Sequence, residues 1–258
     1  MRELSAGGKF ATALSLTAVG GYVDAVGYIA LFQIFTANMS GNSIHVGMSA
    51  GKLSFLELLR PLCAIVSYVI GLIITRVAIG AAARSGLQRI ASLTLGAEAI
   101  LLFLFSQARP TLHLGQIVDL QSPGYFALVA LLAFAMGIQA ATLTHIGALT
   151  IYTTFVTGTL AKFSEAFTRS LFWSYDQFSD GTSMSDIVRY APQQRDVRDA
   201  ASLVSVWICY VLGAALGTIA KQKWEFRCLY APIVLLLSLI LIDQFHPIDI
   251  QEEKHQAG

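Results

Sequence analysis

The stretch FTANMSGNSIHVG, residues 35–47, follows a long apolar run and carries no formal charge unless its histidine is protonated. A second stretch, YTTFVTGTLAKF at residues 152–163, follows another apolar run with a similar layout. Each contains an aromatic residue, a threonine and then a hydroxyl–glycine–polar triplet, Ser40-Gly41-Asn42 in the first and Thr157-Gly158-Thr159 in the second. The recurrence of this motif after a hydrophobic segment decides the predicted architecture.

The composition is that of an integral membrane protein. Of the 258 residues, 55% are hydrophobic and 13% are charged, and the mean hydropathy is +0.63. Soluble domains carry about 25% charged residues, so a water-soluble fold of this size could not hide so much apolar surface. The net charge of +1 argues against an extended nucleic-acid-binding surface. We therefore expect the lipid bilayer to be the main partner of the chain.

Six apolar segments are candidates for membrane-spanning helices, each of which needs about 20 residues. Basic residues are more frequent in the loops on the side of the N-terminus, which predicts a cytoplasmic N-terminus in a bacterial cytoplasmic (inner) membrane. The polar insertion 174–199 is expected to be a cytoplasmic loop with some helix. The six segments are Phe10–Phe32, Pro61–Gly80, Leu87–Ser106, Tyr125–Leu149, Ser202–Ala220 and Tyr230–Phe245.

The two halves of the chain align with each other. An offset of 117 residues places Gly20 on Gly137 and Gly41 on Gly158 without a gap, with identities at eight of the 38 positions from 10 to 47. An offset of 142 places YVIG at 68–71 on YVLG at 210–213, and the change in offset matches the length of the polar insertion. These matches indicate an internal duplication.

Each half holds three predicted spans, and an odd number of spans makes the two halves enter the membrane in opposite directions. The predicted fold is therefore an all-α membrane protein with six transmembrane helices arranged as two three-helix inverted repeats. Repeat 1 covers residues 10–107 and repeat 2 covers residues 125–245, within a single membrane domain of residues 1–258.

The hydroxyl–glycine motifs have the composition of a helix N-cap followed by a flexible glycine. If each motif segment is broken or re-entrant, its free N–H groups and positive helix end point into the membrane and the two ends form a polar site. Two other interpretations stay open. The motifs are also compatible with tight turns at the membrane interface, or with full spans that would give eight crossings and parallel repeats.

These residues resemble a known family. Gly21 and Asp24 on the first span, the sequence NMSGN at 38–42, and GIQAATLTHIGALTIYTTFVTGTL at 137–160 are similar to the YoaK family, also called DUF1275, of bacterial and fungal membrane proteins. The chain departs from the family in Ser40, where threonine is usual, and in Ala140, where asparagine is common. The resemblance implies a six-span membrane protein, compatible with a transporter, and names no substrate.

Polar residues inside apolar runs are the remaining site candidates. Asp24 lies near the middle of the first span, where a carboxylate costs about 2.5–3.5 kcal/mol and must face the bundle interior. It is read either as a proton or cation site or as a structural hydrogen-bond acceptor. Glu98 is similarly placed on the third span and is read either as a pathway residue or as a structural or snorkelling residue. Gln139 is the polar residue of repeat 2 nearest in register to Asp24, and Asn38 precedes the first hydroxyl–glycine triplet. The spacings Gly213-x-x-x-Gly217 and Gly47-x-x-x-Gly51 suit close helix contact.

The function predicted from these features is secondary transport of an unidentified small solute, with proton coupling. The predicted solute or ion pathway consists of Asp24, Asn38, Ser40, Gly41, Asn42, Glu98, Gln139, Thr157, Gly158 and Thr159. An uncoupled channel and a non-transporting scaffold are the alternatives. No catalytic motif, cofactor or metal site is recognised, so the chain is not expected to be an enzyme, and the sequence leaves homo-oligomerisation open.

Overall fold

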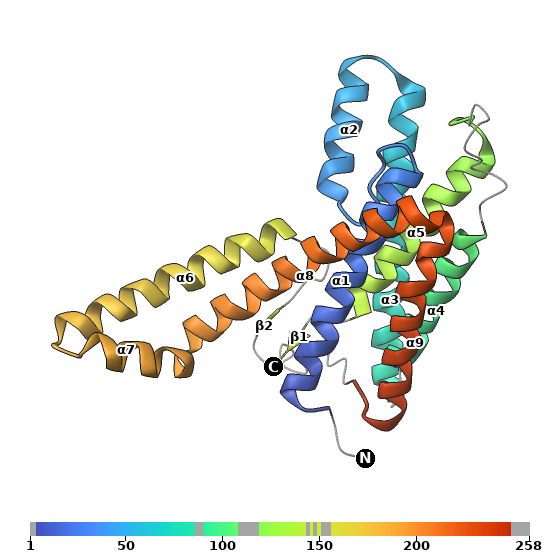
Figure 1. Ribbon diagram of the computed structural model, residues 1–258. Coiled ribbons are helices and arrows are strands. Elements are labelled where there is room, and N and C mark those ends of the chain that lie inside the picture. The colour runs from blue at the N-terminus through green and yellow to red at the C-terminus, as the bar shows by residue number, and fades with distance from the viewer. Residues whose placement is uncertain are drawn as a thin grey trace.

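The computed structural model describes residues 4–85, 90–107, 119–142, 145–146, 149–150 and 156–248. Within these ranges the chain is helical apart from two strands of two residues each, and a long helical arm leaves the helical bundle on one side (Figure 1). The elements are α1 (Ala6–Ala30), α2 (Met39–Gly51), α3 (Phe55–Ser85), α4 (Ile90–Ser106), α5 (Pro123–Thr142), β1 (His145–Ile146), β2 (Leu149–Thr150), α6 (Val156–Ser179), α7 (Met184–Tyr190), the 3₁₀ turn η1 (Ala191–Gln193), α8 (Arg195–Trp224), the 3₁₀ turn η2 (Glu225–Leu229) and α9 (Tyr230–Phe245).

Four helical segments of the described ranges are long and apolar enough to cross a membrane. They are Gly7–Ala30, Phe55–Ser85, Pro123–Thr142 and the 51-residue segment Arg195–Phe245, which contains α8, η2 and α9. Helix α4 is equally apolar but has only 17 residues. Each of the six segments expected from the sequence therefore overlaps a helix, and the chain has the helical, membrane-spanning character that its composition predicts.

Several helix boundaries differ from the predicted ones; α8, for example, runs from Arg195 to Trp224 instead of from Ser202 to Ala220. Helix α3 begins at Phe55 instead of at Pro61, so it contains the proline, which removes one hydrogen bond within the helix. Helix α5 ends at Thr142 instead of continuing to Leu149. The antiparallel pair of β1 with β2, in which His145 pairs with Thr150, replaces the predicted end of that span.

The polar insertion 174–199 is more helical than a loop. Helix α6 continues to Ser179, α7 and η1 follow, and α8 begins at Arg195. Helix α6 packs along α8, and its residues Thr159, Ala166 and Ser170 are buried. A segment of low mean hydropathy can remain helical in this way, because only one of its faces has to be covered.

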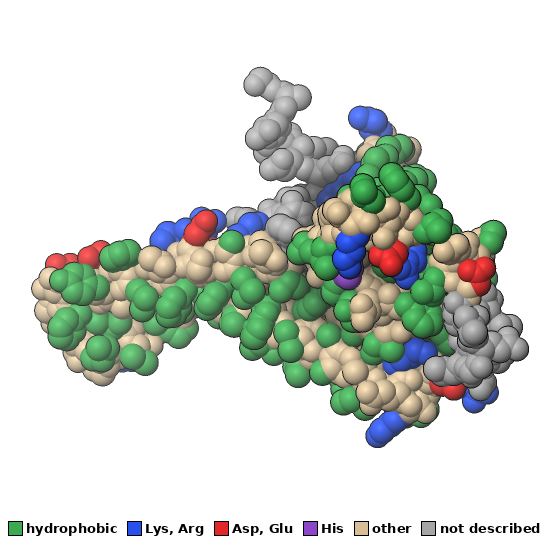
Figure 2. Space-filling view, turned by 90° about the horizontal axis from the view of Figure 1, so that it is seen from above, with side chains coloured by type: hydrophobic (Ala, Val, Ile, Leu, Met, Phe, Trp, Pro, Cys, Tyr) green, Lys and Arg blue, Asp and Glu red, His purple; other side chains and the backbone are tan. Residues whose placement is uncertain are grey.

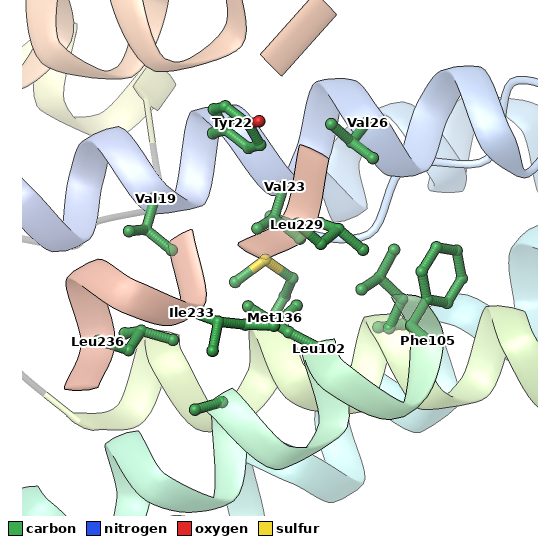
Figure 3. Close-up of a cluster of buried hydrophobic side chains, with 14 of the residues drawn as sticks. Val19, Tyr22, Val23, Val26, Leu102, Phe105, Met136, Leu229, Ile233 and Leu236 are labelled. Atoms are coloured by element: carbon green, nitrogen blue, oxygen red, sulfur yellow. The ribbon is translucent and has the colours of Figure 1, made fainter. Parts of the chain in front are cut away.

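The core of the bundle forms where α1, α4, α5 and α9 meet. Figure 3 shows Val19 and Val23 of α1 pointing toward Met136 of α5 and toward Ile233 of α9, with Leu102 of α4 below them. All five side chains are buried. The packing of these four helices positions the end of α1, from which the candidate site is built.

Glycines allow two helix pairs to come into backbone contact. A methyl group at Gly21 would overlap the carbonyl oxygen of Tyr210, and one at Gly213 would overlap the carbonyl oxygen of Ala18. Gly217 likewise packs on the backbone of Tyr22, so the spacing Gly213-x-x-x-Gly217 serves the α1–α8 contact as expected. Gly71 and Gly137 do the same for α3 and α5, since they lie on the carbonyl groups of Phe134 and Tyr68.

The second small-residue spacing behaves differently. A methyl group at Gly47 or at Gly51 would meet nothing within 4 Å among the described residues. The two spacings look alike in sequence, but only the one on α8 is used for helix contact. A glycine substitution in the α8 spacing therefore tests the helix contact, and the same substitution in the α2 spacing is its control.

We predict that Gly21→Ala and Gly213→Ala each destabilise the protein by about 1–3 kcal/mol, because the added methyl group forces α1 and α8 apart. Gly47→Ala is the matched control and should raise stability by roughly 0.5–1 kcal/mol, since alanine is the better helix former. The midpoint of thermal unfolding of the purified protein in detergent measures both effects. A Gly21→Ala protein as stable as Gly47→Ala would disprove the close contact.

Candidate functional site

Helix α1 ends in a sharp reversal of the chain. Phe32 and Gln33 both adopt positive φ angles, 52° and 70°, and the N–H of Gln33 donates to the carbonyl of Tyr28 over 2.9 Å. Side chains with a Cβ disfavour this region by about 1–2 kcal/mol per residue. The reversal turns residues 34–38 back toward α1, where Thr36 packs on Gly27, a position at which a methyl group would overlap it.

The carboxylate of Asp24 holds this reversed segment. Its Oδ1 accepts hydrogen bonds from the N–H groups of Thr36 and Ala37, both at 2.7 Å, and from the Thr36 hydroxyl at 3.2 Å. Its Oδ2 accepts from the hydroxyl of Tyr210 on α8 at 2.8 Å. Asp24 is 4% exposed. Among the described residues, four hydrogen-bond donors therefore surround the carboxyl group of Asp24.

Helix α2 begins with a different cap from the one expected. Asn38 is the N-cap, and its side-chain oxygen accepts from the N–H of Gly41 at 3.2 Å and from the hydroxyl of Ser40 at 2.7 Å. The triplet Ser40-Gly41-Asn42 therefore forms the first turn of the helix and does not precede it. Asparagine takes the cap because its short amide reaches the free N–H groups of that turn.

The other two residues of the triplet support the connection between α1 and α2. The amide of Asn42 is fully buried, donates to the carbonyl of Phe35 at 2.7 Å and accepts from the N–H of Phe35 at 3.0 Å. The ring of Phe35 lies against Gly41, where a methyl group would overlap it, and also contacts Tyr28 with ring centroids 4.5 Å apart. Gly41 and Asn42 thus act as positioning residues for the segment that Asp24 holds.

The second motif also lies at the start of a helix. Thr157, Gly158 and Thr159 occupy the first turn of α6, where Thr157 is exposed and Thr159 is buried. The preceding residues 152–155, which complete the aligned stretch, lie outside the described residues. The first turns of α2 and α6 therefore carry corresponding hydroxyl–glycine residues.

A cavity of about 400 Å³ brings the two motifs together. Its walls include Asn38 and Ser40 from the first motif, Thr157 from the second, and the side chains of Tyr68 and Tyr210. We call it the motif cavity. Tyr68 and Tyr210 are the two tyrosines that the sequence comparison of the two halves had aligned with each other. The first turns of α2 and α6 line this cavity, so it lies at the positive ends of two helix dipoles.

A second cavity, of about 290 Å³, lies on the other side of Tyr210 and Asn38, and we call it the Asp24 cavity. Gly21, Asp24 and Tyr28 of α1 form one side of it, and Thr218 of α8 is among the residues opposite. Asn38 and Tyr210 line both cavities. The carboxylate of Asp24 is therefore separated from the motif cavity by the tyrosine to which it is hydrogen-bonded.

Of the predicted pathway residues, Asp24, Asn38, Ser40 and Thr157 line at least one of the two cavities. Six line neither cavity: Gly41, Asn42, Gly158, Thr159, Glu98 and Gln139. Glu98 is fully buried on the inner face of α4, and neither of its carboxyl oxygens has a hydrogen-bond partner among the described residues. Gln139 is fully buried on α5 and donates to the carbonyl of Leu16, while its own carbonyl oxygen has no partner in the described part of the chain. Neither residue lines the motif cavity or the Asp24 cavity.

Asp243, which the sequence pattern did not single out, is a further buried carboxyl group, and like Asp24 it is hydrogen-bonded. It accepts from the N–H of Ser92 at 3.1 Å and from the Ser92 hydroxyl, so it caps the first turn of α4 from the last turn of α9. Its other oxygen accepts from the N–H of Ile248 at 2.7 Å. A helix cap supplied from a residue 151 positions away leaves no local signal in the sequence.

Comparison with known proteins gives one family and one relative. A family model described as "Protein of unknown function (DUF1275)" matches residues 12–242. The UPF0700 transmembrane protein YoaK of Bacillus subtilis (strain 168) is 27% identical over 233 residues, which cover 88% of this chain and 90% of that protein. No solved structure matches the chain. The resemblance stated from the motifs is confirmed by both matches.

We predict that Asp24→Ala lowers the free energy of unfolding by about 2–5 kcal/mol, because it leaves the buried N–H groups of Thr36 and Ala37 without an acceptor. Asp24→Asn is the matched variant, since its amide oxygen still accepts from both groups and its NH₂ can donate to the Tyr210 hydroxyl. It should lose clearly less stability. Thermal unfolding in detergent measures both, and equal losses would show that the acceptor role of Asp24 is unimportant.

Proposed function

The chain belongs to the DUF1275 family of transmembrane proteins of unknown function, and on this premise we propose that it is a secondary transporter or permease for a small polar solute. The observation that carries the proposal is the motif cavity, which the first turns of α2 and α6 share. Secondary transporters often bind their solute where two repeats meet, at the ends of interrupted helices. We place the solute site in the motif cavity.

We propose six membrane spans, α1, α3 and α4 in one half and α5, α8 and α9 in the other, as two inverted repeats. The helix pairs support this arrangement, because the most extensive ones recur after exchange of the halves. Helix α1 packs on α8 as α5 packs on α3, α2 packs on α3 as α6 packs on α8, and α4 packs on α5 as α9 packs on α1. Helices α4 and α9, which correspond to each other, also form a pair.

The glycine contacts support the same exchange at the level of single residues. Gly21 lies on the carbonyl of Tyr210, and Gly137 lies on that of Tyr68. The tyrosines are 142 residues apart, as in the sequence alignment, but the glycines are 116 apart and not 117. The packing therefore favours an offset of 116 residues between α1 and α5, whereas the offset of 117 gives the larger number of sequence identities. With an offset of 116, Asp24 corresponds to Ala140.

Asp24 is the residue that we propose to couple transport to protons. A proton on its carboxylate would weaken the bonds from Thr36, Ala37 and Tyr210, since all of these groups donate to it. Ala37 and Tyr210 are also walls of the motif cavity. Gain or loss of the proton can therefore change the shape of the solute site, because Ala37 and Tyr210 are bonded to Asp24 and also line the motif cavity. Glu98 and Gln139 have no place in this step.

The proposal involves no chemical conversion of the solute. The Ser40 hydroxyl donates to the Asn38 side chain, which is an amide and not a base. We further propose that the protein resides in the bacterial cytoplasmic membrane with its N-terminus in the cytoplasm, as the distribution of basic residues predicts.

We predict that a ligand of the motif cavity raises the thermal midpoint of the purified protein, and that Ser40→Ala combined with Thr157→Val removes this shift. Screening a library of small metabolites by thermal shift identifies the ligand. Ser43→Ala is the control, because its hydroxyl bonds to the carbonyl of Met39 within α2 and does not line the cavity. A shift that survives in the double variant would move the site away from the motif cavity.

With a ligand identified, we predict that liposomes containing the protein take it up in a saturable way, and that an inward proton gradient raises the accumulation. Asp24→Asn should abolish the dependence on the gradient while the protein still inserts and binds the ligand. Flux that neither saturates nor responds to the gradient would indicate a channel. A complete absence of both ligand and flux would leave a scaffold as the function.

A further inference from the structure

The arm formed by α6, α7 and the first part of α8 exposes two faces of opposite character. Leu160, Phe167, Leu171 and Phe178 follow one another along α6 at intervals of seven, four and seven residues, so they form one stripe, and all four are exposed. The charged side chains of α6 lie on the far side of the helix from this stripe. The arm therefore combines a long apolar surface with a charged one.

The charged face is held by ion pairs. Arg169 donates from Nε to Asp196 of α8 over 2.8 Å and lies 4.0 Å from Glu165, one turn earlier on α6. Arg195 and Asp199 form a further pair on α8. The side chains of Glu165 and Arg169 are 70% and 55% exposed, so these groups need water.

Neither lipid nor water can surround the arm on all sides. A helix of 24 residues is about 36 Å long, which exceeds the hydrocarbon thickness of about 30 Å. If α6 were surrounded by lipid on all sides, contact of Glu165 and Arg169 with the acyl chains would cost about several kcal/mol for each side chain. If it stood in water on all sides, its apolar stripe would be exposed along most of its length.

The apolar stripe is continuous with the lipid-facing surface of the bundle. Exposed apolar side chains of α8, among them Ile208, Leu212 and Leu216, extend the same kind of surface toward η2. Figure 2 shows most of the charged side chains of the arm along one edge and hydrophobic side chains along the opposite edge, from which they continue onto the bundle. The surface that meets lipid on the bundle thus extends along the arm.

We propose that the arm lies on a lipid–water boundary, with the stripe of Leu160, Phe167, Leu171 and Phe178 against acyl chains and the Glu165–Arg169–Asp196 face in water. Amphipathic helices bind the membrane interface in this way. Residues 156–200 contain five basic and six acidic residues, so the arm has no net positive charge with which to attract anionic lipids. The attachment is therefore apolar and indifferent to the charge of the lipid.

Spin labels test the two faces. Single cysteines replace Phe167, Leu171 and Phe178, and in a second set Glu165 and Asp176, after the native cysteines Cys63, Cys209 and Cys228 are changed to alanine or serine. In phosphatidylcholine vesicles, oxygen should relax the first set more strongly than a water-soluble nickel complex does, and the order should reverse in the second set. The result should be the same with one third phosphatidylglycerol.

Three outcomes would overturn the proposal. If the nickel complex relaxed both sets of spin labels more strongly than oxygen does, the whole arm would lie in water. Protection of the first set from both reagents would make the stripe an interface with a second copy of the chain. A preference of the first set for oxygen that appears only with phosphatidylglycerol would show electrostatic attachment to anionic lipid.

A second measurement does not require removal of the native cysteines. Phe178→Trp is a conservative change at an exposed aromatic position, and its added emission should be quenched by lipids brominated on the acyl chains. The difference from the parent protein isolates this tryptophan. Asp176→Trp, on the charged face, is the control and should be quenched by aqueous iodide instead. Quenching of Phe178→Trp by iodide alone would contradict the proposed boundary. Neither experiment depends on transport.

Discussion

The bonds made by one carboxylate organise the region around the motif cavity. Asp24 receives two backbone N–H groups and a hydroxyl from the segment after α1, and a phenol from α8. The same interaction stabilises the buried charge and the turn through Phe32 and Gln33, whose backbone conformations are unfavourable by themselves. Because α2 begins directly after this segment, the position of its first turn depends on Asp24.

The other contacts of the site depend on that position. Once residues 34–38 lie against α1, Phe35 covers Gly41, and Asn42 closes a reciprocal pair of hydrogen bonds with Phe35. The start of α2 is then rigid, and its hydroxyl group lies at the same cavity as the start of α6. Tyr210 connects this cavity to Asp24, so a change in protonation and a bound solute would act on one shared side chain.

The sequence predicted the apolar helices, the family and the buried position of Asp24, because hydrophobic length and isolated charges are local signals. It also paired Tyr68 with Tyr210 through the internal alignment, and both line the motif cavity. It did not predict that Asn38 caps α2, since Asn38 and Ser40, two residues apart, are both suitable caps. The partners of Asp24 and Asp243 were missed because they are brought close only by the fold. The start of α3 was missed because its first turns contain charged residues, and the end of α5 was missed because apolar residues continue past it.

The bond between Tyr210 and Asp24 joins residues that are 186 positions apart, and this separation has a consequence for biogenesis. At a synthesis rate of about 5–20 residues per second, α1 is available for roughly 10–40 s before α8 emerges from the ribosome. During this interval the groove along Gly21 is open and one oxygen of the carboxylate has no donor from α8. The hydrogen bonding of this buried carboxyl group is therefore completed only after most of the chain has been synthesised.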